Sequence, residues 1–180
     1  MILVVAATER ELTGIEGAET LCTGIGPVEA GLATAFALMQ RRRDAVLHIG
    51  IAGSHTLDPP AIVLGSEAIY CDVLDANSTL PRVERVQPDA RLLSVAQSVL
   101  PEAHVRPIGT SGRVGGAADC DVEAMEGFGV LRAAALVGVP ALELRAISNA
   151  VDEPDRTRWR YDDAFAALHD AVRRLLPALE

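Results

Sequence analysis

The sequence predicts an α/β fold in which one largely buried sheet carries helices on both faces. Apolar runs of strand length alternate along the chain with stretches of helical periodicity, which is typical of this class. Hydrophobic residues make up 49% of the 180 residues and aromatic residues only 3%, so Ala, Val, Leu and Ile must build the core. This usage suits a sheet buried on both faces. Because no repeat or linker divides the chain, we expect one domain over residues 1–180.

Strands are expected where short, continuous apolar runs occur, since such runs are typical of strands buried on both faces. The run from Ile2 to Ala6 predicts the first strand, and a second run from Ala45 to Gly50 should end in a loop of small residues. The run at residues 61–72 indicates either an edge-like strand pair or one bent strand. A weaker candidate spans residues 18–23, and the last strand should begin at residue 141 and stop at a polar pair, Ser148 and Asn149.

Helices are expected where helical periodicity is flanked by capping residues. After a glycine turn at residues 24–26, a helix should extend from Pro27 to about Arg42. Another should begin at an acidic cap, Asp119 or Asp121, and stop near a glycine at residue 138. The remaining predicted helices span residues 89–99 and about 161–176, whereas residues 78–88 and the glycine-rich residues 109–118 should be irregular.

The charge of the chain excludes several classes of function. A formal net charge of −9 repels phosphate backbones and anionic membranes, so we expect no nucleic-acid or membrane partner. All 16 basic residues are Arg, which excludes Schiff-base lysines and Walker-type phosphate loops. No apolar run is long enough to span a membrane, and we expect no signal peptide, because the N-terminal apolar run is short and soon followed by acidic residues.

The cysteines and histidines predict neither a disulfide framework nor a metal site. No CxxC spacing occurs, and both residue types are widely scattered, so reduced thiols in a cytoplasm are the simpler interpretation. The residues concerned are Cys22, Cys71, Cys120, His48, His55, His104 and His169.

The turn at Gly24 and Gly26 does not complete a dinucleotide-binding motif. A GxGxxG sequence would need glycine at position 29, where Glu29 stands, so no nicotinamide cofactor is expected. Two interpretations remain open for this turn. It either serves only the strand-to-helix connection, or lets a ligand approach the backbone closely.

Two acidic residues are candidates for chemistry. Glu11 follows the first strand in the polar stretch Thr8–Glu11, where it is either a solvated acid or a functional one. Glu126 lies in the segment Glu123–Gly127 within the expected apolar helix, and a carboxylate buried there without a partner is costly. It therefore either faces water or binds a ligand, and ribose hydroxyls suit a carboxylate because it can accept two hydrogen bonds.

Five segments occur in an order that resembles the purine nucleoside phosphorylase and nucleosidase superfamily: "AATERE", "GIGPVEAG", "IGIAGS", "VEAMEG" and "LRAISNAVD". The likeness extends from Val4 to Asp152 and is greatest to futalosine hydrolases of menaquinone biosynthesis and 5′-methylthioadenosine/S-adenosylhomocysteine nucleosidases. The resemblance implies a three-layer α/β/α sandwich with a mixed central sheet, and cleavage of an N-glycosidic bond without a cofactor. It also implies a nucleoside substrate and a homodimer or higher homo-oligomer.

The resemblance further implies roles for individual residues. Glu11 matches the acid that positions and deprotonates the attacking water, and Met125 with Glu126 matches the pair that holds the ribose. Ala52 and Gly53 match backbone that lines the site. The 5′ substituent would then be held by variable loops such as residues 74–86, or by a neighbouring subunit.

Ser148 and Asn149 match the Ser-Asp pair of adenine-cleaving nucleosidases, in which the Asp helps to protonate N7. An amide at this position can donate to O6 or N7 and accept from a ring N–H, which suits a 6-oxopurine better than adenine. The expected product is hypoxanthine, and futalosine is the expected substrate. The alternative for Asn149 is a residue that caps a turn through its own side chain.

Hydrolysis is expected rather than phosphorolysis. Ile51 stands where a phosphate site would use a hydroxyl, and the acidic Glu11 favours water and repels phosphate. The alternatives are a 5′-methylthioadenosine/S-adenosylhomocysteine nucleosidase, a purine nucleoside phosphorylase, and a non-catalytic module that binds purine nucleosides. Glu11 distinguishes the last class, since a binding module needs no acid to activate water.

Overall fold

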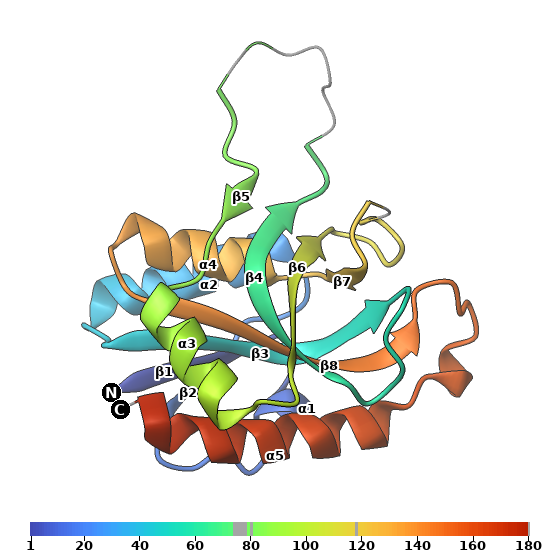
Figure 1. Cartoon of the computed structure of the whole chain (residues 1–180). Helices are drawn as coiled ribbons and strands as arrows, with labels where there is room; N and C mark the ends of the chain where they lie inside the picture. Colours follow the sequence, from blue (N-terminus) through green and yellow to red (C-terminus); the bar gives the residue numbers. More distant parts are fainter. Residues whose placement is uncertain (74–78, 80, 118, 180) are drawn as a thin grey trace.

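The computed structural model describes residues 1–73, 79, 81–117 and 119–179 (Figure 1). Its strands are β1 (Ile2–Ala6), β2 (Glu19–Cys22), β3 (Ala45–Ser54), β4 (Ile62–Tyr70), β5 (Arg85–Val86), β6 (His104–Thr110), β7 (Val122–Ala124) and β8 (Ala141–Ala150). Its helices are α1 (Glu9–Leu12), α2 (Pro27–Gln40), α3 (Ala90–Val99), α4 (Gly127–Leu136), the 3-10 turn η1 (Arg156–Arg158) and α5 (Tyr161–Leu179).

The strands form one mixed sheet, as predicted, and among the described residues it contains eight strands. β1, β2, β3 and β8 run parallel to one another, whereas β7 is antiparallel to β3 and β4 is antiparallel to β8. β6 then pairs in parallel with both β4 and β7. Because β3, β8, β4, β6 and β7 pair in a closed circuit, part of the sheet curls back onto itself.

Helices cover both faces of the sheet, which confirms the predicted α/β class (Figure 1). Alternate residues of β1 point to opposite faces, as in any strand. Val4 packs in the cluster that includes Leu92 of α3 and Leu168 of α5, whereas Val5 packs in the cluster that includes Ala30 of α2 and Val130 of α4. The continuous apolar run of β1 therefore reflects burial on both sides.

Several predicted boundaries were wrong because neighbouring strands decide them. The expected loop after Gly50 continues as strand to Ser54, since this end of β3 pairs with β8 and β7. For residues 61–72 the alternative of one bent strand is confirmed, since β4 has a register shift between Gly65 and Glu67, and it lies between β8 and β6 rather than at an edge. β6 was not predicted at all, because Arg106 and Pro107 interrupt its apolar pattern.

The predicted helix from Asp119 or Asp121 was wrong in its first third. Residues 122–124 form β7, and α4 begins only at Gly127. The sequence there has helix-forming residues, but pairing with β3 and β6 extends the backbone. Part of the predicted irregular stretch at residues 78–88 forms β5, and residues 78 and 80 lie outside the described residues.

Candidate active site

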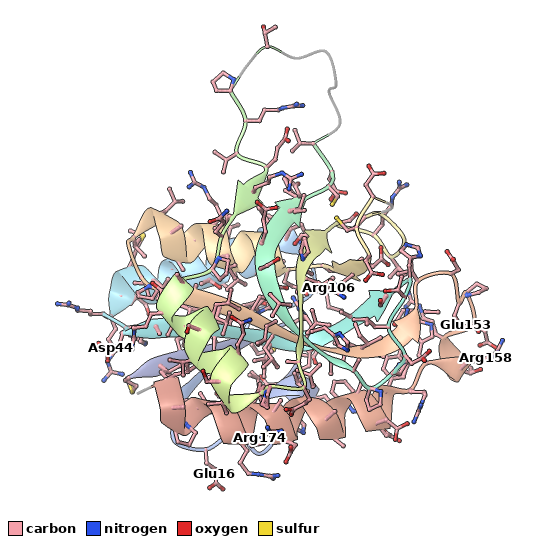
Figure 2. All side chains as sticks on the ribbon, viewed as in Figure 1. Glu16, Asp44, Arg106, Glu153, Arg158 and Arg174 are labelled. Carbon is pink, nitrogen blue, oxygen red and sulfur yellow. The ribbon has the colours of Figure 1, made fainter. Side chains whose placement is uncertain are left out.

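The parallel strands β1, β2, β3 and β8 end at one edge of the sheet, where ligands of open α/β sheets commonly bind. Most charged side chains lie elsewhere: Figure 2 shows Asp44 and Arg174 at the periphery of the molecule, and Glu153 beside Arg158, with which it forms a 2.8 Å ion pair. Of the described residues, five charged side chains are instead buried near the strand ends, namely Glu11, Glu123, Glu126, Glu143 and Arg145.

Glu11 lies in α1, the short helix that follows β1, rather than in a loop. One carboxylate oxygen accepts hydrogen bonds from the backbone N–H and the hydroxyl of Thr8, at 2.9 and 2.8 Å. The other oxygen accepts from the N–H of Ile51 in β3 at 3.2 Å. Glu11 is only 4% exposed, so these bonds hold a buried carboxylate in one orientation between β1 and β3. A carboxylate fixed in this way can orient a water molecule.

The sequence pattern predicted Glu126 inside a helix, but Glu126 is the N-cap residue of α4. Its Oε1 accepts from the N–H of Gly26 at 3.1 Å, and its Oε2 lies 3.5 Å from Nη2 of Arg145. Burial raises its pKa, against the lowering effects of the Arg145 charge and the Gly26 N–H. The glycine turn thus has a structural role, since Gly26 adopts φ 105° and donates to this acid. Met125 precedes Glu126 and is half-buried.

Arg145 is the main residue that the sequence analysis missed. It is 1% exposed, on β8, in register with Gly50 of β3. A Cβ atom at position 50 would clash with Nη1 of Arg145 and lie 2.8 Å from Oε1 of Glu11, so Arg145 and Glu11 meet across this glycine. A charged pair two residues apart in an apolar strand, Glu143 and Arg145, was the available signal, since both side chains point to the same face.

Ser148 and Asn149 lie at the end of β8, as predicted, and the strand continues one residue further, to Ala150. Ile147 pairs with Ala52 and Asn149 with Gly53, so Ser148 is an extra residue at a bulge, a feature that commonly re-aims side chains near active sites. The Ser148 hydroxyl lies 2.8 Å from Oδ1 of Asn149 and 3.3 Å from the carbonyl oxygen of Ala52, so it can donate to either. The amide nitrogen Nδ2 of Asn149 donates to the carbonyl oxygen of Ala150 at 2.9 Å.

Gly53 brings the amide of Asn149 close to the backbone of β3. A Cβ atom at position 53 would lie only 3.0 Å from Nδ2 of Asn149 and 3.6 Å from Cγ of Glu123. Glu123 is buried and accepts hydrogen bonds from the N–H groups of Gly115 and Ala117, at 2.7 and 3.4 Å. These hydrogen bonds hold the glycine-rich loop after β6 beside Asn149. The sequence did not predict this position of the loop.

The described residues contain no group of three or more His, Cys, Asp or Glu side chains that could hold a metal. None of the described helices combines the length and apolarity that crossing a membrane requires. Two surface depressions lie near the start of β8, at the opposite end of that strand from Asn149, and none of the predicted site residues lines them. Of the loop expected to hold a 5′ substituent, residues 74–78 and 80 lie outside the described residues.

Comparisons with known proteins agree on one family. Residues 19–178 match the family model of the phosphorylase superfamily. A futalosine hydrolase of Streptomyces coelicolor is 35% identical over 190 residues, which cover 92% of this chain and 81% of that protein. A mutant futalosine hydrolase of Helicobacter pylori has a TM-score of 0.84 at 19% identity, over 99% of this chain and 97% of that chain.

A 5′-methylthioadenosine/S-adenosylhomocysteine nucleosidase of Colwellia psychrerythraea, solved in complex with adenine, has a TM-score of 0.83 at 21% identity, over 99% of this chain and 93% of that chain. Likeness at such identities establishes the fold, whereas the sequence match to the Streptomyces protein and the family model establish kinship. The resemblance that the five motifs suggested is confirmed: the chain belongs to the phosphorylase superfamily.

Proposed function

We propose that this protein is a futalosine hydrolase, which cleaves the N-glycosidic bond of futalosine with water and releases hypoxanthine. The observation that carries the proposal is the 35% identity to a futalosine hydrolase over 92% of the chain. The buried acids Glu11 and Glu126 support it, since a non-catalytic binding module would need no buried acid for water. We also infer that residues 1–180 act as one domain.

In the proposed mechanism, Glu11 orients a water molecule and takes a proton from it as the water oxygen bonds to C1′. Glu126, beside Met125, binds the ribose hydroxyls. The C1′–N9 bond breaks through an oxocarbenium-like state, and the other water proton stays on the new C1′ hydroxyl. The departing base takes a proton from solvent, and Glu11 releases its own proton to solvent. Two carboxylates near the sugar favour this positive charge electrostatically, because they act where water is largely excluded. Arg145 lies between them and offsets their mutual repulsion.

Hydrolysis is supported over phosphorolysis by the surroundings of Ile51. Its backbone N–H, which could otherwise bind an anion, already donates to Glu11 at 3.2 Å. Its side chain offers no hydroxyl, and the nearby carboxylate of Glu11 would repel phosphate. The same features admit water, which is neutral and can donate to a carboxylate.

A 6-oxopurine is supported by the hydrogen bonds of Asn149. The Ser148 hydroxyl lies against Oδ1, and the carbonyl oxygen of Ala150 accepts one proton of Nδ2. One amide N–H and one Oδ1 lone pair are left for a ligand. We propose that this N–H meets O6 or N7 of the base and that Oδ1 accepts from a ring N–H. Ala52 and Gly53 contribute backbone to the same edge.

Purified protein should convert futalosine to hypoxanthine and the free ribose derivative at a rate that does not change when phosphate is added. Mass spectrometry of the products, with methylthioadenosine and inosine as comparison substrates, tests this. Ribose 1-phosphate among the products would instead identify a phosphorylase, and the absence of any product would favour a binding module.

Glu11→Gln should lower kcat by roughly 10²–10⁴-fold because the general base is lost.

Glu126→Gln should impair cleavage of ribonucleosides by about tenfold or more, because hydrogen bonds to a charged group contribute about 1.5–3 kcal/mol. The 2′-deoxy analogues, which lack one hydroxyl, should lose much less. Steady-state kcat/KM on matched ribose and deoxyribose substrates measures the difference. Equal losses on both sugars would contradict the assignment of Glu126 to the ribose.

Asn149→Asp should shift the preference toward adenine nucleosides by roughly tenfold or more. A protonated carboxyl can donate to N7 while accepting from the 6-amino group, and a mismatched buried polar group costs about 1–3 kcal/mol. The ratio of kcat/KM for futalosine and methylthioadenosine is the measurement. An unchanged ratio would remove Asn149 as the group that reads the base.

We also propose that the protein is a homodimer or higher homo-oligomer in the cytoplasm. Four large apolar side chains form an exposed stripe on α2, at helical spacings of three and four residues, which is a sign of an interaction surface. These residues are Val28, Leu32, Phe36 and Met39, each 64–78% exposed. All three cysteines are free, which suits a reducing compartment.

Phe36→Glu should shift the protein toward monomers, because it places a charge in the centre of the α2 stripe. Light scattering after size exclusion, over a range of concentrations, measures the mass. Ala166→Glu, which adds the same charge to the exposed side of α5, should leave the assembly intact. If wild type is already monomeric at all concentrations, the oligomer proposal fails.

A further inference from the structure

Glu143 is a fully buried acid that the proposed chemistry does not use. It lies on β8 two residues before Arg145, so the two side chains share one face of the strand. In β3, His48 stands in register with Glu143, and Gly50 stands in register with Arg145. These four positions place an acid, an imidazole and a guanidinium together beneath the N-terminus of α4.

Glu143 and His48 occupy two sides of the Arg145 guanidinium. Nε of Arg145 donates to Oε1 of Glu143 at 2.8 Å, and Nη2 donates to Nε2 of His48 at 2.5 Å. Nη1 lies 3.4 Å from the carbonyl oxygen of Ile51. The guanidinium is a rigid, planar fork, so partners at Nε and Nη2 set its orientation. Its contact with Oε2 of Glu126, at 3.5 Å, is longer than either of these bonds.

His48 takes part as a neutral acceptor. Its Nδ1 lies 3.0 Å from the carbonyl oxygen of Val5, which can only accept, so Nδ1 carries the proton. Nε2 then accepts from Arg145, which can only donate. Burial and the charge of Arg145 hold the pKa of His48 well below its usual value. The negative charge that balances Arg145 in this direction therefore comes from Glu143.

Glu143 is also held in an arrangement that packing alone would not favour. A Cβ atom at Gly127, the first residue of α4, would clash with both carboxylate oxygens, so the carboxylate lies directly against the backbone there. Its Oε2 is buried and has no hydrogen-bond partner among the described residues, and such groups cost about 1–3 kcal/mol. Replacing a buried ion pair by apolar residues is often neutral or stabilising. Stability alone therefore does not explain why Glu143 and Arg145 are buried together.

We propose that Glu143, together with His48, is a positioning residue that fixes the Arg145 guanidinium between Glu11 and Glu126. A guanidinium without these anchors would turn toward one of the two acids and pair with it bidentately. That acid would then no longer be free to bind its water or its ribose hydroxyls. By holding Nε and Nη2, the anchors keep one positive charge between both carboxylates and leave their oxygens free for the substrate. This inference rests on the proposed hydrolysis.

Glu143→Gln keeps an acceptor for Nε of Arg145 but removes the charge. On futalosine, kcat should fall by about 10–100-fold, the range for residues that orient a reacting group, with KM changed less than about threefold. In an Arg145→Gln background the same change should lower kcat by less than about twofold, because Glu143 acts through Arg145. Losses that simply multiply in the double variant would overturn the inference.

Glu19→Gln is the matched control. Glu19 pairs with the buried Arg43 at 2.5 Å, at the beginning of β2 and far from the strand ends that form the site. It should lower the melting temperature while kcat stays unchanged. His48→Leu removes the second anchor and should repeat the Glu143→Gln pattern, with kcat reduced, KM kept and the loss absent in the Arg145→Gln background.

Nitrogen NMR of the wild-type protein tests the same geometry without a variant. The Nε–H of Arg145 should exchange slowly with solvent, and its Nη groups should give separate signals because the guanidinium does not rotate. Averaged Nη signals would contradict the inference even if no Glu143 variant folds. If wild type cleaves no nucleoside, the proposed function fails on its own. If it cleaves futalosine and Glu143→Gln is equally active, only the positioning role is lost.

Discussion

The burial of the Arg145 guanidinium is the constraint on which the rest of the site depends. A charge without water requires partners in several directions, and these come from separate elements: Glu143 on the same strand, His48 on β3, Glu126 before α4 and, across Gly50, Glu11 on α1. The pKa of Arg145 is raised, because these acids together outweigh the effect of burial. Removing a partner would leave an uncompensated buried charge, which is why the surrounding elements have little freedom to move.

Glycines make this concentration of charge sterically possible. Side chains at Gly50 and Gly127 would collide with Arg145 and Glu143, and Gly53 leaves room for the amide of Asn149. The packing of α4 on α2 follows the same rule, since a Cβ atom at Gly129 would clash with the carbonyl oxygen of Pro27. This close helix contact brings the N-terminus of α4 to the glycine turn and completes the bond between Gly26 and Glu126.

The same turn links the site to the surface of the molecule. α2 begins directly after the N–H that holds Glu126, and its outward side carries the apolar stripe centred on Phe36. On the opposite face of the sheet, α5 reaches the site too, since the ring of His169 contacts the carbonyl oxygen of Glu11. Both helical layers therefore contact the segments that position the acids. A change of packing in either layer would shift side chains at the strand ends.

The sequence by itself determined the α/β class, the run of β1, the start of α2 and the superfamily, because these depend on local periodicity, capping residues and short motifs. It also singled out Glu11, Glu126 and Asn149 as candidate site residues. Only the tertiary structure decided the strand at residues 122–124, the cap position of Glu126 and the central place of Arg145. Strand pairing overrides local helix preference. Apart from Glu143, the partners of Arg145 come from residues far apart in the chain, so local patterns do not contain them.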